Sequence, residues 1–171
     1  MGRDKALLPY RGATLVEWIA AQAREVCSSV TLVGAPERYR QLGLPCLAER
    51  YAGCGPLSGI EAALRHRGGG WSLIVACDMP RLTPELFGGM LAAAERSPAD
   101  VVAAEPRGGR LEPLCAVWNQ RALPAVEAAL AAGRYAVRGL FTDLQVLHYS
   151  IDSEMLTRNV NSPEDWLECS R

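Results

Sequence analysis

Apolar and polar positions along the chain follow two patterns that alternate from one end to the other. Short runs that are largely apolar predict strands, and they cover residues 30–34, 45–49, 73–77, 101–105, 113–119 and 146–151. Longer segments whose apolar residues recur at helical spacing predict helices, and they cover residues 15–26, 55–66, 83–96, 123–133 and 161–171. Strands that alternate with helices predict an α/β sandwich with a largely parallel sheet.

Helix ends and one strand carry further local signals. Thr83 and Pro84 suit the start of the third predicted helix, and Gly133 suits the end of the fourth. Residues 73–77 are apolar or small without alternation, which predicts a strand buried on both faces. In such sheets ligands bind beyond the carboxyl ends of the strands, so residues there are the candidates for function.

Length and composition describe an ordinary globular chain. The 171 residues predict a single domain over residues 1–171. The net charge of -1 excludes a protein-wide basic surface for nucleic acid, although a local pocket for a small anion stays open. No signal peptide or apolar run of membrane-spanning length is visible, so we expect a cytoplasmic protein without a membrane partner. Six cysteines without C-x-x-C spacing argue against structural zinc.

The segment VACDMP places Asp78 directly after a predicted strand and before Met79 and Pro80. A carboxylate at the carboxyl end of a strand is well placed to bind a hard cation such as Mg²⁺, which prefers oxygen and phosphate ligands. The alternative is a turn aspartate ahead of a proline, and these residues alone do not decide between the two.

The segment GCGPLSG joins two glycines to the start of a predicted helix. Gly53 and Gly55 allow backbone amides to approach a ligand closely, and the helix offers its positive end. The segment differs from the dinucleotide fingerprint, because Ser58 replaces the third glycine and Pro56 has no N–H to donate. A tight turn that only starts the helix is the alternative.

Two further polar features stand near the ends of the chain. In NVNSPEDW, Asn159 and Asn161 are two residues apart, so in an extended segment both amides point to one side. Such amides can bind a polar ring edge, a phosphate or a cation, or Asn161 can simply cap the last helix. Lys5 is a compact charge suited to a phosphate, or else an ordinary surface residue.

These segments occur in an order that resembles one family. MGRDKALLPYRGATLVEW, ERYAGCGPLSGI, VACDMPRLTPEL, EPLCAVWN and NVNSPEDW resemble successive blocks of the molybdenum cofactor guanylyltransferases, the MobA-type nucleotidyltransferases. The resemblance covers nearly the whole chain and is most specific in D-K-A-L, G-P-L-x-G, C-D-M-P and N-x-N-x-P-E-D. It implies a three-layer α/β/α sandwich, the Rossmann-like nucleotidyltransferase fold with a mostly parallel sheet.

The resemblance also implies a reaction. Members transfer GMP from GTP to the terminal phosphate of molybdopterin and release pyrophosphate, with Mg²⁺ as the metal. The implied partners are therefore GTP and molybdopterin, with molybdenum cofactor synthesis proteins and acceptor molybdoenzymes in addition. Because the pterin phosphate is the nucleophile, catalysis rests on positioning and on neutralising charge at the α-phosphate.

The family's functional residues have counterparts in this chain. By resemblance, Lys5 contacts the GTP phosphates, and Asp78 binds Mg²⁺ and orients the triphosphate. Gly55, Pro56 and Leu57 line the nucleotide pocket by the same resemblance.

The remaining candidate residues are carried over with departures from the family pattern. Glu49 stands where members usually have an aspartate ahead of the glycine turn, and its extra methylene changes its reach. Asn159 and Asn161 lie toward the pterin side by resemblance, with the metal as an alternative for Asn161. Arg110, in the glycine loop before EPLCAVWN, is our own candidate for a second anion contact.

The start of the chain departs most from the family. Members open with a strand and a glycine-rich loop, L-A-G-G-x-S-x-R, before M-G-x-D-K, whereas this chain opens with M-G-R-D-K. By resemblance, that part supplies a central strand and the backbone amides that hold the triphosphate. We expect Met1 to be an internal methionine, and we expect the fold without that strand to leave two neighbouring strands with unpaired edges.

Three other functions remain open. One is cytidylyl transfer to the same pterin, since the choice of base depends on few contacts. Another is nucleotidyl transfer to a sugar phosphate, although such enzymes are usually longer. The third is a protein that binds a pterin or nucleotide without catalysis.

Overall fold

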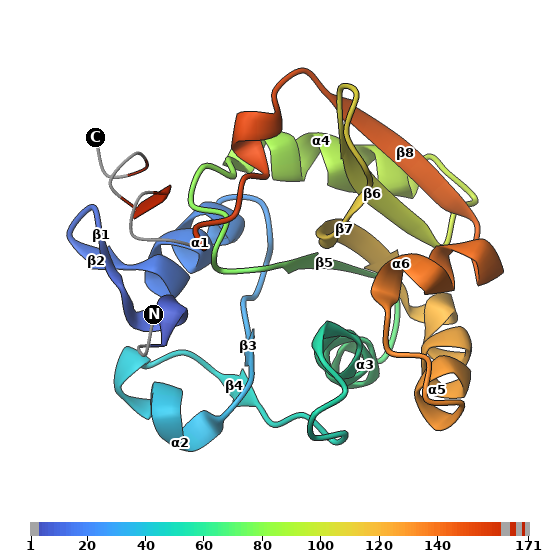
Figure 1. The fold of residues 1–171 in the computed structure, drawn as a ribbon, viewed down its shortest axis with the longest axis horizontal. Helices are drawn as coiled ribbons and strands as arrows, with labels where there is room; N and C mark the ends of the chain where they lie inside the picture. The colour runs from blue at the N-terminus through green and yellow to red at the C-terminus, as the bar shows by residue number, and fades with distance from the viewer. Residues whose placement is uncertain (1–3, 162–164, 167–168, 170–171) are drawn as a thin grey trace.

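The chain folds into three layers around a central sheet (Figure 1). The computed structural model describes residues 4–161, 165–166 and 169. The four strands of the sheet, in order across it, are β5 (Trp71–Val75), β7 (Glu112–Asn119), β6 (Val101–Pro106) and β8 (Val146–Ile151). β7 is antiparallel to both of its neighbours and β8 is parallel to β6, so β5, β6 and β8 run in one direction.

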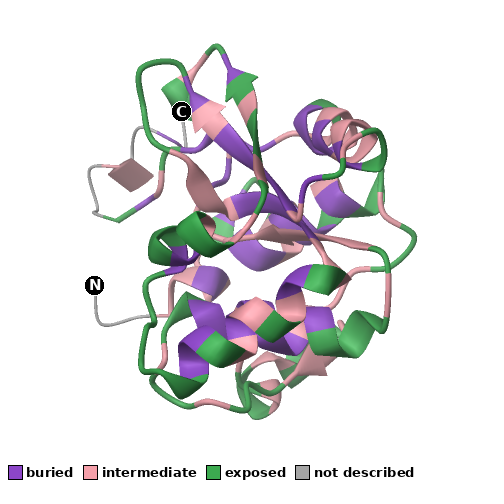
Figure 2. Cartoon of the chain, turned by 90° about the vertical axis from the view of Figure 1, so that its right-hand side faces the viewer, coloured by how far each residue is buried: buried purple, intermediate pink, exposed green. Residues whose placement is uncertain are grey.

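Helices cover both faces of this sheet. They are α1 (Leu15–Arg24), α3 (Pro56–Arg67), α4 (Pro84–Glu95), α5 (Leu123–Ala131) and α6 (Val137–Leu140). Val102 and Ala104 pack with α1 and α4, whereas Val101 and Ala103 pack with α3 and α5, because successive strand residues point to opposite faces. Figure 2 shows the result, with buried residues on the strands and on the helix sides that face them. This arrangement confirms the predicted α/β/α sandwich.

A second, smaller sheet lies beside the first. It consists of β3 (Leu32–Val33) and β4 (Cys46–Leu47), which pair in parallel. Both strands are shorter than the sequence predicted. Among the described residues, no backbone ladder joins this pair to β5, the nearest strand of the central sheet.

Several short elements escaped the sequence analysis because they hold only two to four residues, too few for a periodic pattern. They are the hairpin β1 (Pro9–Tyr10) and β2 (Ala13–Thr14), the short helix α2 (Pro36–Tyr39), and the 3₁₀ turns η1 (Lys5–Leu7), η2 (Arg40–Leu42), η3 (Gln120–Ala122), η4 (Phe141–Asp143) and η5 (Glu154–Leu156). The helix predicted at 161–171 lies largely outside the described residues.

Local signals at the helix ends are confirmed, and one burial prediction is wrong. The Thr83 side chain accepts a hydrogen bond from the backbone N–H of Leu86, and Gly133 has a left-handed φ of 70° after α5. The strand predicted as buried at 73–77 is instead half-buried at every residue of β5. The reason is that one edge of β5 borders a cavity rather than another strand.

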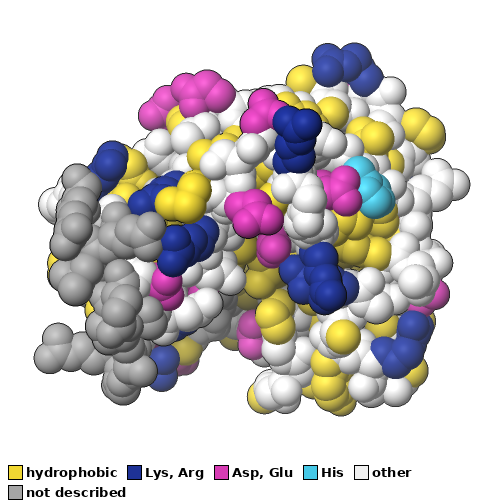
Figure 3. All heavy atoms as spheres, turned by 45° about the horizontal axis from the view of Figure 1, so that its top comes forward, with side chains coloured by type: hydrophobic (Ala, Val, Ile, Leu, Met, Phe, Trp, Pro, Cys, Tyr) yellow, Lys and Arg dark blue, Asp and Glu magenta, His cyan; other side chains and the backbone are white. Residues whose placement is uncertain are grey.

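Helix length and the distribution of charge can be read from the described residues. None of the helices drawn from the described residues is long and apolar enough to cross a lipid bilayer. On the face drawn in Figure 3, cationic and anionic side chains are interspersed and do not gather in a patch of one sign.

Two neighbouring glycines in α4 predict opposite responses to alanine. A Cβ on Gly88 would make ordinary contact with Val26, 3.7 Å away, so Gly88→Ala should stabilise the fold by about 0.5–1 kcal/mol through helix propensity. A Cβ on Gly89 would press against the ring of Tyr149, with Cζ only 3.1 Å away. Gly89→Ala should therefore give a lower unfolding free energy than Gly88→Ala in urea denaturation. Equal gains at the two positions would contradict this packing.

Candidate functional site

Three segments that are far apart in sequence meet at Lys5. Its Nζ donates a hydrogen bond to Oδ1 of Asn161 at 2.5 Å and lies 3.9 Å from Oδ2 of Asp78. The backbone N–H of Val160 donates to the backbone carbonyl of Asp78 at 2.8 Å, which fixes the C-terminal segment against the end of β5. The sequence identified Lys5, Asp78 and Asn161 separately, and the structure places them in one cluster.

Asp4 holds Lys5 in position from within the chain. Its side chain caps η1 by accepting a hydrogen bond from the backbone N–H of Ala6 at 3.1 Å. The same carboxylate accepts from the hydroxyl of Tyr39 at 3.0 Å and from Arg38 at 3.2 Å. Asp4 therefore links η1 to α2.

Lys5 has a signal in the sequence that motif analysis overlooked. It is the only lysine in the chain, and the other 17 of the 18 Lys and Arg residues are arginines. A lysine places a compact, strongly hydrated charge where the planar fork of an arginine would not fit the same contacts.

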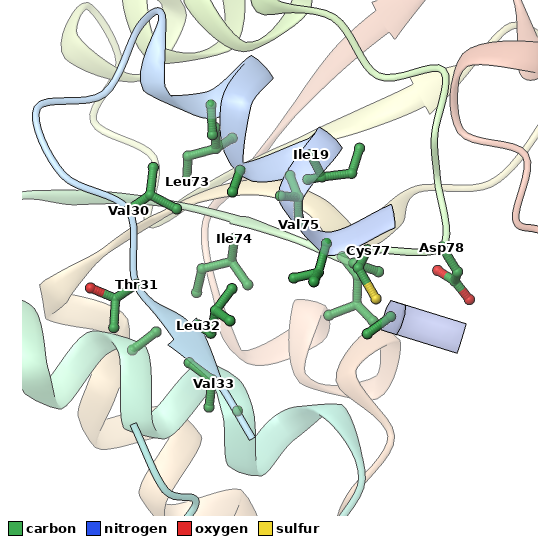
Figure 4. Close-up of a pocket in the computed structure, with 18 of the residues that line it drawn as sticks. Ile19, Val30, Thr31, Leu32, Val33, Leu73, Ile74, Val75, Cys77 and Asp78 are labelled. Carbon is green, nitrogen blue, oxygen red and sulfur yellow. The ribbon is translucent and has the colours of Figure 1, made fainter. Parts of the chain in front are cut away.

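Asp78 stands just beyond β5, at one end of a cavity (Figure 4). The indole N–H of Trp18, on α1, donates to the carbonyl of Pro80 at 3.0 Å and so fixes the turn that follows Asp78. Burial raises the pKa of Asp78, and the nearby Lys5 charge offsets that effect only in part. The site thus holds a carboxylate whose negative charge lacks full compensation from the protein.

The neighbouring thiol is not a nucleophile at neutral pH. Burial, followed by the negative charges of Asp78 and Asp4, raises the pKa of Cys77 to about 11. The thiol therefore stays protonated, and thiolate attack is not available at this position. This agrees with a reaction in which a substrate supplies the nucleophile.

The glycine turn before α3 has a backbone that only glycine adopts readily. Gly53 has φ 77°, and Gly55 has φ 65° with ψ -158°, in a region reached almost only by glycine. Pro56 occupies the first turn of α3 and lines the same cavity as Lys5 and Asp78. Leu57 is fully buried in the core and is not among the residues that line this cavity.

Glu49 lies near this turn but apart from the cluster at Lys5. Its side chain is exposed, and a Cβ built on Gly59 of α3 would come 3.4 Å from its Oε1. Arg50 follows it and forms an ion pair with the fully buried Glu61 at 3.0 Å. The loop after β4 is therefore anchored to α3, and Glu49 lies against Gly59 of that helix.

The other predicted residues lie in different settings. Asn159 has a buried Oδ1 that makes no hydrogen bond within the described part of the protein, so an acceptor is left for a ligand or water. Asn161 is exposed and already receives the Lys5 hydrogen bond. Arg110 is exposed on the loop between β6 and β7, and no described contact joins it to the cluster.

The cluster by itself supplies only some of the ligands that a divalent cation needs. Within the described ranges, no three His, Cys, Asp or Glu side chains group together. Asp78 and Oδ1 of Asn161, which both contact Nζ of Lys5, are the hard oxygen donors of this cluster. This set fits Mg²⁺, which takes one or two protein oxygens and completes its coordination with water and substrate phosphates.

Comparison with known sequences identifies the family. The sequence model described as "MobA-like NTP transferase domain" matches residues 1–147. The chain belongs to this family. A probable molybdenum cofactor guanylyltransferase of Pelotomaculum thermopropionicum is 35% identical to this MobA-like chain, over 96% of the chain and 83% of the relative. A molybdenum cofactor guanylyltransferase of Cereibacter sphaeroides is 33% identical over 96% and 85%.

Solved structures confirm the fold of the MobA-like domain. Molybdopterin-guanine dinucleotide biosynthesis protein A from Archaeoglobus fulgidus matches with a TM-score of 0.84 and 24% identity, over 99% of this chain and 90% of that one. A 2-C-methyl-D-erythritol 4-phosphate cytidylyltransferase from Thermus thermophilus matches with a TM-score of 0.75 and 21% identity, over 97% and 92%. The nucleotidyltransferase fold is therefore shared by proteins named for different bases.

Gly55 of the MobA-like chain should tolerate no side chain, although a Cβ there would meet no atom within 4 Å. We expect Gly55→Asn to lower the unfolding free energy by about 1–3 kcal/mol, because its backbone conformation is strained for any residue with a Cβ. Gly43 is the matched control: it has nearly the same φ, 64°, but a ψ of 14°, where asparagine is tolerated. Urea denaturation of both variants measures the difference, and equal losses would contradict it.

Asp78→Asn should stabilise the ligand-free protein at neutral pH. Because burial raises the folded-state pKa of Asp78 above its ordinary value of 3.8, the neutral carboxyl is the form that favours folding. Its stabilising effect is present below that ordinary value and is lost as the pH rises through the raised pKa. The advantage of the variant should therefore appear above that pKa and vanish near pH 3, as measured by thermal unfolding.

The exposed Asp152→Asn provides the control for this pH series, because solvent already surrounds its carboxylate. A stability curve for Asp78→Asn that lies below the wild type at pH 7 would show that the Lys5 ion pair outweighs burial.

Proposed function

We propose that the chain is a molybdenum cofactor guanylyltransferase, which transfers GMP from GTP to molybdopterin and forms molybdopterin guanine dinucleotide and pyrophosphate. Family membership and the names of relatives that match nearly the whole chain support this reaction. The structural observation that carries it is the meeting of Lys5, Asp78 and Asn161 at the end of β5.

The proposed reaction needs no nucleophile from the protein. A phosphate oxygen of molybdopterin forms a bond to the α-phosphorus of GTP, and the bond from that phosphorus to the pyrophosphate oxygen breaks. Lys5 binds the negatively charged triphosphate, because its compact ammonium group can donate hydrogen bonds to several phosphate oxygens. The Lys5–Asn161 contact must open or be shared when phosphate oxygens enter.

A Mg²⁺ ion would be held by Asp78, with Asn161 or Asn159 as the additional oxygen donor. When bound, such a cation neutralises triphosphate charge and withdraws electron density from the phosphorus. The part of the protein is to orient the incoming phosphate: the incomplete charge compensation of Asp78 favours a cation in its vicinity.

The remaining candidate residues have proposed roles at the two ends of the substrates. Gly55 and Pro56 offer close backbone approach to the nucleotide, and Glu49 lies beside that turn with its carboxylate free for the base or ribose. We assign Asn159 to the pterin, a proposal supported by its buried Oδ1, which has no hydrogen-bond partner among the described residues. Arg110 remains a proposed second anion contact. Its long side chain would have to extend from the loop between β6 and β7 to the substrate phosphates.

We also propose that residues 1–171 act as one domain and that the reaction takes place in the cytoplasm. The two apolar cores pack on opposite faces of one sheet, so they support each other across residues 19–151. GTP is available in the cytoplasm, and the same compartment holds the cofactor synthesis proteins and molybdoenzymes that we expect as further partners.

The test is transfer of label from α-phosphate-labelled GTP to molybdopterin in the presence of Mg²⁺, with CTP and UTP as alternatives. We expect GTP to be the substrate and Lys5→Ala to lower the rate by about 10²–10³, the typical cost of losing one electrostatic stabiliser. Arg96→Ala, an exposed cation at the end of α4, is the control and should leave the rate unchanged.

Binding is measured separately, because Lys5 is the only lysine. Acylation of its amine, followed by mass spectrometry, should slow when GTP is added. Protection by CTP alone would replace guanylyl with cytidylyl transfer, and protection by GTP without any transfer would favour a binding protein without catalysis.

A further inference from the structure

Asp165 binds both ends of the short segment that carries Asn159 and Asn161. Its Oδ2 accepts a hydrogen bond from the backbone N–H of Asn161 at 3.1 Å. Its Oδ1 accepts from the guanidinium group of Arg158 at 3.1 Å, and the two side chains form an ion pair. We call these two contacts the Asp165 latch. One carboxylate therefore holds the residue before Asn159 and the backbone of Asn161 together.

The middle of the same segment is bound to the end of β5. The backbone N–H of Val160 donates to the carbonyl of Asp78 at 2.8 Å, and the Val160 side chain is fully buried. The N–H groups of two successive residues, Val160 and Asn161, are thus both occupied. Because the backbone is held at both, the place of Asn161 Oδ1, 2.5 Å from Nζ of Lys5, depends on these contacts.

The residue after Asp165 is anchored to the part of the chain that carries Lys5. The ring of Trp166 meets the ring of Tyr10 edge to face, with centroids 5.9 Å apart. Trp166 also packs against a small apolar core beside α1 and the β1–β2 hairpin, made of Tyr10, Leu15, Val160 and Cys169. Since β1 begins two residues after η1 ends, the chain near Lys5 and the chain near Asn161 are joined both at Lys5 and at Trp166.

We propose that Asp165 is a positioning residue of the candidate site, and that it acts through Asn161. This role rests on the proposed guanylyl transfer, in which phosphate oxygens enter at the contact between Lys5 and Asn161. Because the latch fixes the Asn161 backbone, that contact opens by rotation of the Asn161 side chain while the segment stays in place. The amide is thereby kept in the cluster with Asp78 throughout binding.

A local capping bond accounts for only one of the two contacts of Asp165. An acidic side chain that accepts from a backbone N–H a few residues earlier is a common feature of helix starts. The ion pair with Arg158 lies outside such a cap, and it gives the carboxylate a second fixed point on the other side of Asn159. Arg158 also offsets a negative charge that would otherwise repel a triphosphate.

The test reads Lys5 directly, because Lys5 is the only lysine. Acylation of its amine is followed by mass spectrometry in the full chain, without nucleotide or metal. Asp165→Asn should speed acylation by about three- to tenfold, the range that corresponds to the loss of one net hydrogen bond, because Asn161 would leave Nζ more often. Asn161→Ala removes the acceptor itself and should give at least the same acceleration.

Three control variants separate positioning from general stability. Asp143→Asn breaks an exposed ion pair with Arg134, 2.9 Å long, and should leave acylation unchanged. Arg158→Asp combined with Asp165→Arg restores an ion pair, but a guanidinium group cannot accept from the Asn161 N–H, so acylation should stay fast. Asp165→Glu keeps the carboxylate and should restore part of the protection. It also serves as the second variant if Asp165→Asn fails to fold.

The transfer assay gives an independent measurement. Asp165→Asn should lower kcat by about tenfold or more and leave KM for GTP within about twofold, because a displaced Asn161 affects alignment after the nucleotide has bound.

Three results would overturn the proposal. Unchanged acylation in Asp165→Asn would show that Asn161 needs no support from Asp165. Full protection in the variant with the exchanged ion pair would make the latch a stabilising contact alone. A raised KM with an unchanged kcat would assign Asp165 to nucleotide binding. Absence of transfer in the wild type would contradict guanylyl transfer instead, and the acylation rates would then decide the role of Asp165 by themselves.

Discussion

The charge of Asp78 at the end of an apolar strand is the constraint around which the candidate site is built. A carboxylate that is partly removed from water loses hydration free energy, so it requires a nearby cation or hydrogen-bond donors. Lys5 supplies the cation, and it is held there because Asp4 caps its turn and anchors that turn to α2. The bond from Val160 to the Asp78 backbone adds the C-terminal segment. One partly compensated charge thus brings together the two ends of the chain and the middle.

The central sheet explains both the rigidity of this site and its opening. β7 pairs on both sides, and alternate side chains of β6 and β7 enter two separate cores, which fixes the direction of β5. The other edge of β5 borders a cavity of about 470 Å³ that Asp78 also lines. Within the described residues β5 pairs only with β7, and this accounts for the half-burial of every residue of β5.

Much of this arrangement was predictable because it depends on local patterns. The long helices and the strands of the central sheet follow from hydrophobic spacing. Asp78 follows from its place after a strand, and Lys5 and Asn161 from the D-K-A-L and N-x-N motifs. Their contact was not predictable from spacing, since Lys5 and Asn161 are 156 positions apart and meet only through the folded sheet. The half-burial of β5 was missed for a related reason. An apolar run shows that a strand prefers burial, but it does not show whether a neighbouring strand is present to bury it.

The choice of base must depend on features outside the shared fold. Proteins named for guanylyl and for cytidylyl transfer have similar folds, so neither the sheet nor a phosphate contact at Lys5 distinguishes the two. A base is read by hydrogen bonds at fixed positions, which requires a loop with one conformation. For the proposed reaction we infer that this loop is the segment from Glu49 to Gly55, since Arg50 is bound to the buried Glu61 and the Tyr51 N–H donates to Ser58. Because Glu61 and Ser58 both belong to α3, these two contacts fix the backbone that leads into the glycine turn.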